Sequence, residues 1–245
     1  MNYKYIGTKF KDRLGMKLSI VGITFSDIIP KEAISYKKKT KVCIMPLIIK
    51  SAKGSIIAFN HNYTAKPCAK FYLGYTNWIS PGVESFLSNE EVNNRKPEHF
   101  IKNKELALSF LKENVPDRLR NNVIIIKPLE KFHKNEKPEV VIFFANADQL
   151  SGLVYLINYN SPTEERISAP FASACSSVFS LPLKYAKQGI NKAVWGLHDI
   201  SARKRLPKDL MSLSMPYQLF EEMYANIDDS FLNTENWEII KKRNN

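Results

Sequence analysis

The chain has 245 residues, of which 44% are hydrophobic and 24% are charged, with a formal net charge of +12. This hydrophobic fraction supports a folded core and excludes a disordered or collagen-like chain. No apolar run approaches 18 residues, and the first fifteen residues lack the apolar stretch of a secretory signal, so we expect a cytoplasmic protein without a membrane span.

Most of the excess positive charge lies in the first quarter of the chain. Residues 1–60 contain 12 Lys or Arg and three Asp or Glu, a net charge of +9, with a run at Lys37, Lys38, Lys39 and Lys41. Such a patch could attract nucleic acid or a small anionic ligand. Lysine greatly outnumbers arginine, the usual base-reading residue, so a solvated surface is favoured over a nucleic-acid interface.

Apolar periodicity predicts alternating strands and helices in the first half of the chain. The predicted elements are, in order, a strand over 18–25, a helix over 41–53, a strand over 55–60, helices over 66–74 and 102–114, and a strand over 122–127. In the helix over 41–53, Thr40 could be the cap and Gly54 the stop, whereas Pro46 predicts a kink or a later start.

The second half continues the alternation. The predicted elements are a strand over 139–145, a helix over 147–158, a strand over 166–170, a short helix or turn over 172–180, strands over 192–198 and 210–215, and helices from Pro216 and over 234–243. Asn146 and Gln149 have the spacing of a capping box. This order predicts an α+β (or α/β) fold, a single domain over 1–245 around a mixed sheet, with a helical extension over 216–243.

The two halves, 18–128 and 139–200, show a weak internal similarity. In each, a strand, a helix and a second strand lead to a short segment with a cysteine, Cys68 or Cys175. This pairing matches the strand over 55–60 with that over 166–170, and the strand over 122–127 with that over 192–198. One hypothesis is a duplication with a pseudo-two-fold axis, and the alternative is chance similarity between two βαβ units.

Common catalytic and phosphate-binding motifs are absent, so the three cysteines are the leading candidates for chemistry. Cys43 lies in the first turns of a predicted helix, and Cys68 and Cys175 each begin a short helix, where the helix dipole stabilises a thiolate. The pattern is compatible with a redox thiol, a soft-metal site or an iron–sulfur cluster. The alternative is three small buried residues.

A second candidate cluster follows the predicted strand over 192–198. It contains His198, Asp199, Ser201 and Arg203. Arg203 could clamp a carboxylate or phosphate, and His198 could act as a general base. Asp199 could instead pair with Arg203 or cap a turn at Ser201, which would make the cluster structural.

Three functions therefore remain open. The first is binding of a small molecule or a cofactor through the cysteine segments and the Ser201–Arg203 loop. The second is a thiol-dependent or acid/base-dependent enzyme acting on a small anionic metabolite. The third is a nucleic-acid-associated protein that uses the basic first 60 residues. The sequence does not indicate an oligomeric state.

Short motifs along residues 18–240 give the chain a resemblance to a known family. They are Val42-Cys43, Cys68 to Gly74, Lys127-Pro128-Leu129, Pro138 to Phe143, Asp148-Gln149-Leu150, Ala169-Pro170-Phe171, Cys175, Gly196, Asp199, Ser201-Ala202-Arg203, Pro216-Tyr217, Glu222-Met223, Ser230-Phe231-Leu232 and Trp237. With them the chain resembles the uncharacterised family called domain of unknown function 169. The resemblance implies a single cytosolic domain and supports Cys43, Cys68, Cys175 and the segment from Asp199 to Arg203 as candidate positions. It implies no reaction. Where the family often has a glycine-rich step after Cys68, this chain has Ala69-Lys70.

Overall fold

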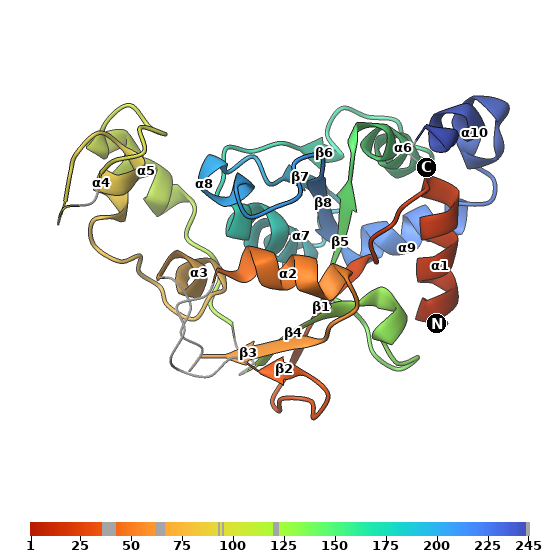
Figure 1. Cartoon of the computed structure of the whole chain (residues 1–245), viewed down its shortest axis with the longest axis horizontal. Helices are drawn as coiled ribbons and strands as arrows, with labels where there is room; N and C mark the ends of the chain where they lie inside the picture. Colours follow the sequence, from red (N-terminus) through yellow and green to blue (C-terminus); the bar gives the residue numbers. More distant parts are fainter. Residues whose placement is uncertain (36–42, 62–66, 93, 95, 120–122, 244–245) are drawn as a thin grey trace.

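Eight strands of the described chain form one mixed sheet, in the order β2-β3-β4-β1-β5-β8-β7-β6 (Figure 1). The structure is a computed structural model that describes residues 1–35, 43–61, 67–92, 94, 96–119 and 123–243. The strands are β1 (Val21–Ser26), β2 (Ile34–Ser35), β3 (Ile57–Asn60), β4 (Val123–Pro128), β5 (Val140–Ala145), β6 (Ile167–Ser168), β7 (Ala193–Gly196) and β8 (Met211–Pro216). The pairs β2–β3 and β6–β7, at opposite edges, are parallel, and the inner pairs are antiparallel.

Helices cover both faces of this sheet. They are α1 (Tyr3–Leu14), α2 (Ile44–Ala52), α3 (Pro67–Tyr72), α4 (Val83–Leu87), α5 (Lys104–Glu113), α6 (Ala147–Ile157), α7 (Leu181–Gln188), α8 (Ile200–Arg203), α9 (Tyr217–Asn226) and α10 (Glu235–Lys242), with 3₁₀ turns η1 (Leu129–Lys131) and η3 (Phe231–Asn233) and the π-helix η2 (Ser176–Ser180). None of the described helices combines the length and the apolar character needed to span a bilayer.

Two large hydrophobic cores lie on opposite faces of the sheet, and a smaller cluster of buried residues lies at β3 and β4. The first packs α2, α3, η2 and α7 against the sheet, and the second packs α1, α6, α9 and α10 against the other face. Neighbouring residues of a strand point to opposite faces, so Ile142 of β5 enters the first core and Phe143 the second. The predicted single α+β domain around a mixed sheet is confirmed.

The N-terminal helix α1 is absent from the predicted elements. Asn2 caps it by accepting a hydrogen bond from the N–H three residues along the chain, and Gly15 ends it with φ of +65°. Ile6, Phe10 and Leu14 recur at helical spacing and are buried. Phe10 lies 5.0 Å from the ring of Phe220, so α1 closes the second core.

Local capping signals correctly located several helix ends. Asn146 and Gln149 form the predicted capping box at the start of α6. Pro46 does not kink α2, because it lies in the first turn, where backbone N–H groups have no intrahelical partner. In α5, Leu106 is 51% exposed, whereas its neighbour Ala107 is buried. Thr40 and the run Lys37 to Lys41 lie outside the described residues.

Strand order is the same in the two halves when it is read from each edge toward the centre: second, third, fourth and first strand. The first and fourth strands of each half pair over six residues, beginning with Val21 opposite Pro128 and with Val140 opposite Pro216. Gly22 lies opposite Val141 where β1 meets β5. A two-fold axis between β1 and β5 would generate this arrangement. The duplication itself stays a prediction.

The strand equivalences drawn from the sequence are wrong by one strand. β3 lies second from its edge and therefore corresponds to β7, whereas the predicted match for 55–60 was the edge strand β6. Likewise β4 corresponds to β8, so the matching unit in the second half reaches residue 216, beyond the expected 139–200. The cysteine that matches Cys175 is consequently Cys43: each precedes the helix that leads into the third strand of its half.

Candidate functional site

A cleft of about 960 Å³ lies between the sheet domain and a lobe that contains α4 and α5. We define the lobe as the described residues of 80–118, because Tyr75 and Ile79 pack against the first core. Four segments line the cleft: the start of α2, the connection from β3 to β4, residues 171–175 before η2, and the connection from β7 to β8. The start of α2 and residues 171–175 occupy corresponding positions in the two halves of the sheet. The β3–β4 and β7–β8 connections correspond in the same way.

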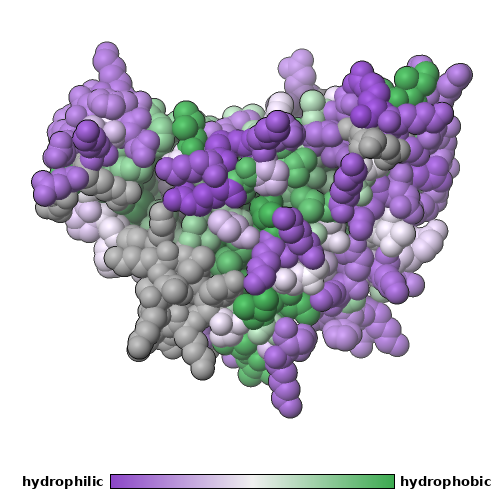
Figure 2. All heavy atoms as spheres, viewed as in Figure 1, coloured by the Kyte–Doolittle hydropathy of each residue, from purple (hydrophilic) through white to green (hydrophobic). Residues whose placement is uncertain are grey.

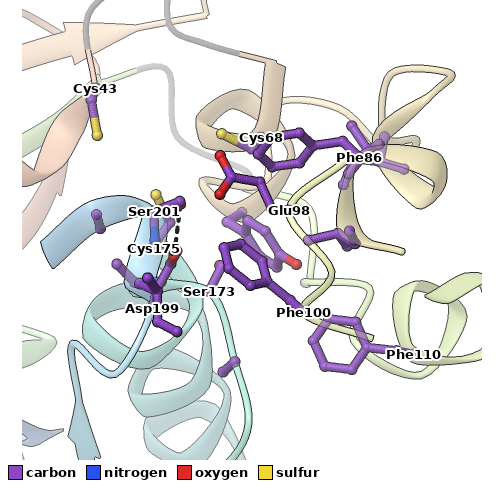
Figure 3. Close-up of a pocket in the computed structure, with 18 of the residues that line it drawn as sticks. Cys43, Cys68, Phe86, Glu98, Phe100, Phe110, Ser173, Cys175, Asp199 and Ser201 are labelled. Carbon is purple, nitrogen blue, oxygen red and sulfur yellow. Dashed lines mark hydrogen bonds between the residues drawn. The ribbon is translucent and has the colours of Figure 1, made fainter. Parts of the chain in front are cut away.

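The structure brings all three cysteines to this cleft. Figure 3 shows Cys43, Cys68 and Cys175 entering the same space from different elements. Cys43 and Cys68 are half-buried, whereas Cys175 is 6% exposed and belongs to the first core. The interpretation of the cysteines as buried residues is therefore correct for Cys175, and the other two line the cleft with partial exposure.

Burial controls the ionisation of the groups at the floor of the cleft. Burial raises the pKa of the Cys175 thiol well above its ordinary value, and the neighbouring Cys68, Cys43 and Asp199 raise it further. The expectation of a thiolate stabilised at a helix start is therefore wrong for Cys175, which stays protonated at neutral pH. Burial likewise raises the pKa of Tyr72, although a hydrogen bond with Ser173 opposes the shift.

Asp199 holds two walls of the cleft together. Its Oδ1 accepts hydrogen bonds from the Ser201 N–H at 2.9 Å and the Ser201 hydroxyl at 2.6 Å, and its Oδ2 accepts from the Ala174 N–H at 3.1 Å (Figure 3). The carboxylate thus caps α8 and ties the loop after β7 to the segment that carries Cys175. Of the two structural interpretations of Asp199, the cap at Ser201 is the one found.

Arg203 does not line the cleft. Its guanidinium donates to the carbonyl oxygens of Leu210 at 2.7 Å and Lys208 at 2.6 Å, so it closes the turn after α8. The structure therefore places Arg203 away from any ligand in the cleft and gives it a structural role. His198 lines the cleft and is exposed, with its Nε2 3.1 Å from the Trp195 carbonyl oxygen.

The comparison with family models decides the family of the chain. The model described as domain of unknown function 169 (DUF169), an uncharacterised ArCR family, matches residues 9–226. The chain belongs to this family. No curated protein and no solved structure matches it significantly. The resemblance seen in the short motifs is confirmed, and it carries no activity with it.

Much of the cleft in this DUF169 chain comes from residues that the sequence did not single out. The lobe contributes Phe86, Glu98, Phe100 and Phe110, and the turn after α8 contributes cationic side chains beside Arg203. Figure 3 shows the Glu98 carboxylate pointing from the lobe into the cleft. Residues 75–101 have no periodic pattern, so nothing in that stretch indicated which side chains converge. The Lys204-Arg205 doublet, which directly follows the candidate loop, was the sequence signal that could have indicated the cationic side chains of the cleft.

Two non-glycine residues with left-handed backbones lie beside the cleft. His99 in the lobe has φ of +54°, and Leu197 after β7 has φ of +68°. The Ser177 hydroxyl accepts from the Leu197 N–H at 3.3 Å and stabilises this turn. Such conformations are costly and gather at functional sites.

Within the described residues, no group of three His, Cys, Asp or Glu side chains could hold a metal ion, so the thiols share the cleft without forming a metal-binding group.

Proposed function

We propose that this protein binds a small organic anion with an apolar or aromatic body in the cleft. The observation that carries the proposal is convergence: Cys43, Cys68, Cys175 and Ser201 are far apart in the chain, yet all line one cavity of about 960 Å³. Ligand sites in proteins are concave and mostly apolar, with a few polar groups that fix orientation, and this volume is at the upper end of their range.

The apolar part of the ligand would contact aromatic side chains. Phe110 and Phe171 meet edge to face with ring centroids 5.2 Å apart, and Phe86 and Phe100 meet edge to face at 6.4 Å. All four rings line the cleft. Aromatic rings prefer offset or edge-to-face partners, so this wall suits a flat apolar body.

The anionic part of the ligand would contact Lys204 and Arg205. Both side chains line the cleft, and neither forms an ion pair with a residue that the structure describes. Arg205 donates one hydrogen bond, to the Ser201 carbonyl oxygen at 2.9 Å, so the remaining guanidinium donors are available to a carboxylate, phosphate or sulfonate. The predicted anion-binding residue Arg203 is thus replaced in this role by its two neighbours.

The thiols contribute polarisable lining to this cleft. Cys43 and Cys68 are partly exposed, and Cys175 is protonated for the reason given above. Sulfur packs favourably against aromatic groups, which fits the same class of ligand. The proposal is one of binding and includes no covalent step.

A pair of matched fluorescent probes tests the proposal. 8-Anilinonaphthalene-1-sulfonate carries an aromatic body and a sulfonate, and N-phenyl-1-naphthylamine is its neutral counterpart. We expect the wild-type chain to bind one equivalent of the sulfonate and to prefer it over the neutral probe. The double variant Lys204→Ala/Arg205→Ala should lose about tenfold in affinity for the sulfonate alone, since each exposed charge pair contributes less than about 1 kcal/mol.

Lys208→Ala is the control, because Lys208 carries the same charge in the same turn and does not line the cleft. It should bind both probes as the wild type does. The proposal is wrong if the wild-type chain binds neither probe with 1:1 stoichiometry, or if Lys208→Ala weakens sulfonate binding as much as the double variant does.

A further inference from the structure

The lobe is joined to the sheet domain by a narrow stem. The Leu119 N–H donates to the Gly74 carbonyl oxygen at 3.2 Å, so the chain enters and leaves the lobe at neighbouring points. Gly74 has φ of +75°, and a Cβ atom there would lie 2.5 Å from the Asp117 carbonyl oxygen. Glycine is required at this position both for its backbone conformation and for the close approach of the two segments.

Within the lobe, the backbone is tied to itself. α4 packs against α5, and the N–H groups of Glu98 and Phe100 donate to the carbonyl oxygens of Phe86 and Leu87, both at 2.9 Å. The ring pair of Phe86 and Phe100 adds an apolar centre. Such internal bonding allows a segment to move as one body about its connections.

Contacts between the lobe and the sheet domain are sparse by comparison, whereas Tyr75 and Ile79 of the stem pack against the first core and the Tyr75 hydroxyl donates to the Phe59 carbonyl oxygen at 2.9 Å. Phe110 meets Phe171, and Asp117 forms an exposed ion pair with Lys187 at 3.4 Å. No strand of the described sheet belongs to the lobe, and Figure 1 shows α4 and α5 standing to one side of it. In Figure 2 the outer surface of the lobe is hydrophilic, and apolar side chains gather where the lobe meets the domain.

The opposite lip of the cleft exposes large apolar side chains. Phe171 is 63% exposed and Ile200 is 69% exposed, and both line the cleft. The lobe faces them with apolar lining of its own, including Val83, Leu87 and Val92. Apolar surface of this kind favours any movement that removes it from water.

We propose that the lobe is a hinged cap that closes over the bound ligand, turning on the stem formed by residues 74–79 and Leu119 and burying Phe171 and Ile200. The inference rests on the proposed binding function and adds to it how the ligand is enclosed. Closure would exclude water and strengthen the contacts of Lys204 and Arg205 with an anion. The β3–β4 connection carries this lobe, whereas its counterpart between β7 and β8 is the short segment 197–210.

The first test alters the stem of the full chain with the sulfonate probe as ligand. Gly74→Ala places a methyl group against Asp117 and forces the stem apart. Gly189→Ala is the matched control, since Gly189 has a similar φ of +67° but open space around a Cβ atom. Neither glycine lines the cleft. We expect Gly74→Ala to weaken probe binding at least tenfold and Gly189→Ala to leave it unchanged. Equal affinities in two folded variants would overturn the cap.

Stopped-flow kinetics provide a second test that does not depend on the folding of Gly74→Ala. When the cap closes after the probe has entered, the observed binding rate levels off at the rate of this rearrangement as probe concentration rises. Phe110→Ala removes the ring contact with Phe171 and should raise that plateau several-fold. Leu108→Ala, on the same helix but outside the cleft lining, should match the wild type. A rate that rises linearly without a plateau in the wild type would overturn the cap.

The outcomes separate the two proposals. If the wild-type chain binds no probe, the binding function fails. If it binds the sulfonate with the expected dependence on Lys204 and Arg205, but Gly74→Ala behaves like Gly189→Ala and the observed rate does not level off, the binding function stands and the cap alone is refuted.

Discussion

Asp199→Ala should be one of the most damaging single substitutions in the cleft, because one carboxylate satisfies donors from two separate segments. Its Oδ1 receives the N–H and the hydroxyl of Ser201, and its Oδ2 receives the N–H of Ala174. Ala174 is 2% exposed, so water cannot readily replace the lost acceptor. The substitution therefore removes a helix cap and leaves a buried amide without a partner.

The expected loss of stability follows from these two effects. Removing an N-cap side chain costs about 0.5–2 kcal/mol. Leaving a buried backbone N–H unsatisfied costs about 1–3 kcal/mol. Because α8 is short and its cap falls at the lower end, we expect Asp199→Ala to lower the free energy of unfolding by about 2–4 kcal/mol. Asp199→Asn keeps the amide oxygen as an acceptor for Ser201, although its NH₂ group can turn toward the Ala174 N–H and leave that donor unpaired. Because the cap is preserved, this substitution should cost less than alanine.

Urea unfolding of the full chain, followed by circular dichroism, measures these differences. Asp209→Ala is a suitable control, since Asp209 is an exposed aspartate in the turn after α8. It should change the unfolding free energy by less than about 0.5 kcal/mol. A loss in Asp199→Ala no larger than that of the control would refute the reasoning that this carboxylate holds two walls of the cleft together.

Two further predictions concern Arg203 and Cys175. Arg203→Ala should lower the unfolding free energy by about 1–3 kcal/mol and leave sulfonate-probe affinity unchanged, because its guanidinium bonds only backbone carbonyls; a selective loss of probe binding in calorimetry would contradict it. Since the folded-state pKa of Cys175 is raised, the contribution of this thiol to stability should be constant below the ordinary thiol pKa of about 8.5 and fall above it by up to about 1.4 kcal/mol per pH unit. Urea titrations at several pH values should show a shallower fall in Cys175→Ala, and an equal slope would contradict this.

Local patterns predicted most of the regular elements. Runs of β-branched and aliphatic residues located the central strands, because those strands are buried on both faces whichever neighbours they pair with. The capping box at Asn146 and Gln149 could be predicted because all its atoms lie within one turn of chain. The helix α1 follows the same rules, with its cap at Asn2 and its buried stripe, although it is absent from the predicted elements.

The pairing of strands could not be predicted in the same way. Matching the halves by element order paired the strand over 55–60 with the strand over 166–170, which is not its equivalent in the sheet. The order along the chain does not specify which strand occupies an edge. Sheet order depends on side-chain packing between segments that are far apart in the chain, such as β1 with β4 and with β5. Once that order is known, Cys43 and Cys175 occupy corresponding places, whereas the order of elements along the chain had matched Cys68 with Cys175.

The sequence by itself determined the fold class, the family motifs and the residue types available for a site. Only the tertiary structure decided that Cys43, Cys68, Cys175 and Ser201 share one cleft, since the cleft forms where connections from both halves of the sheet meet. It also showed that the Arg203 guanidinium bonds the backbone of its own turn, whereas Lys204 and Arg205 line the cavity. The physical reason is that burial and hydrogen-bond partners depend on where segments meet in space, whereas capping and periodicity depend on near neighbours in the chain.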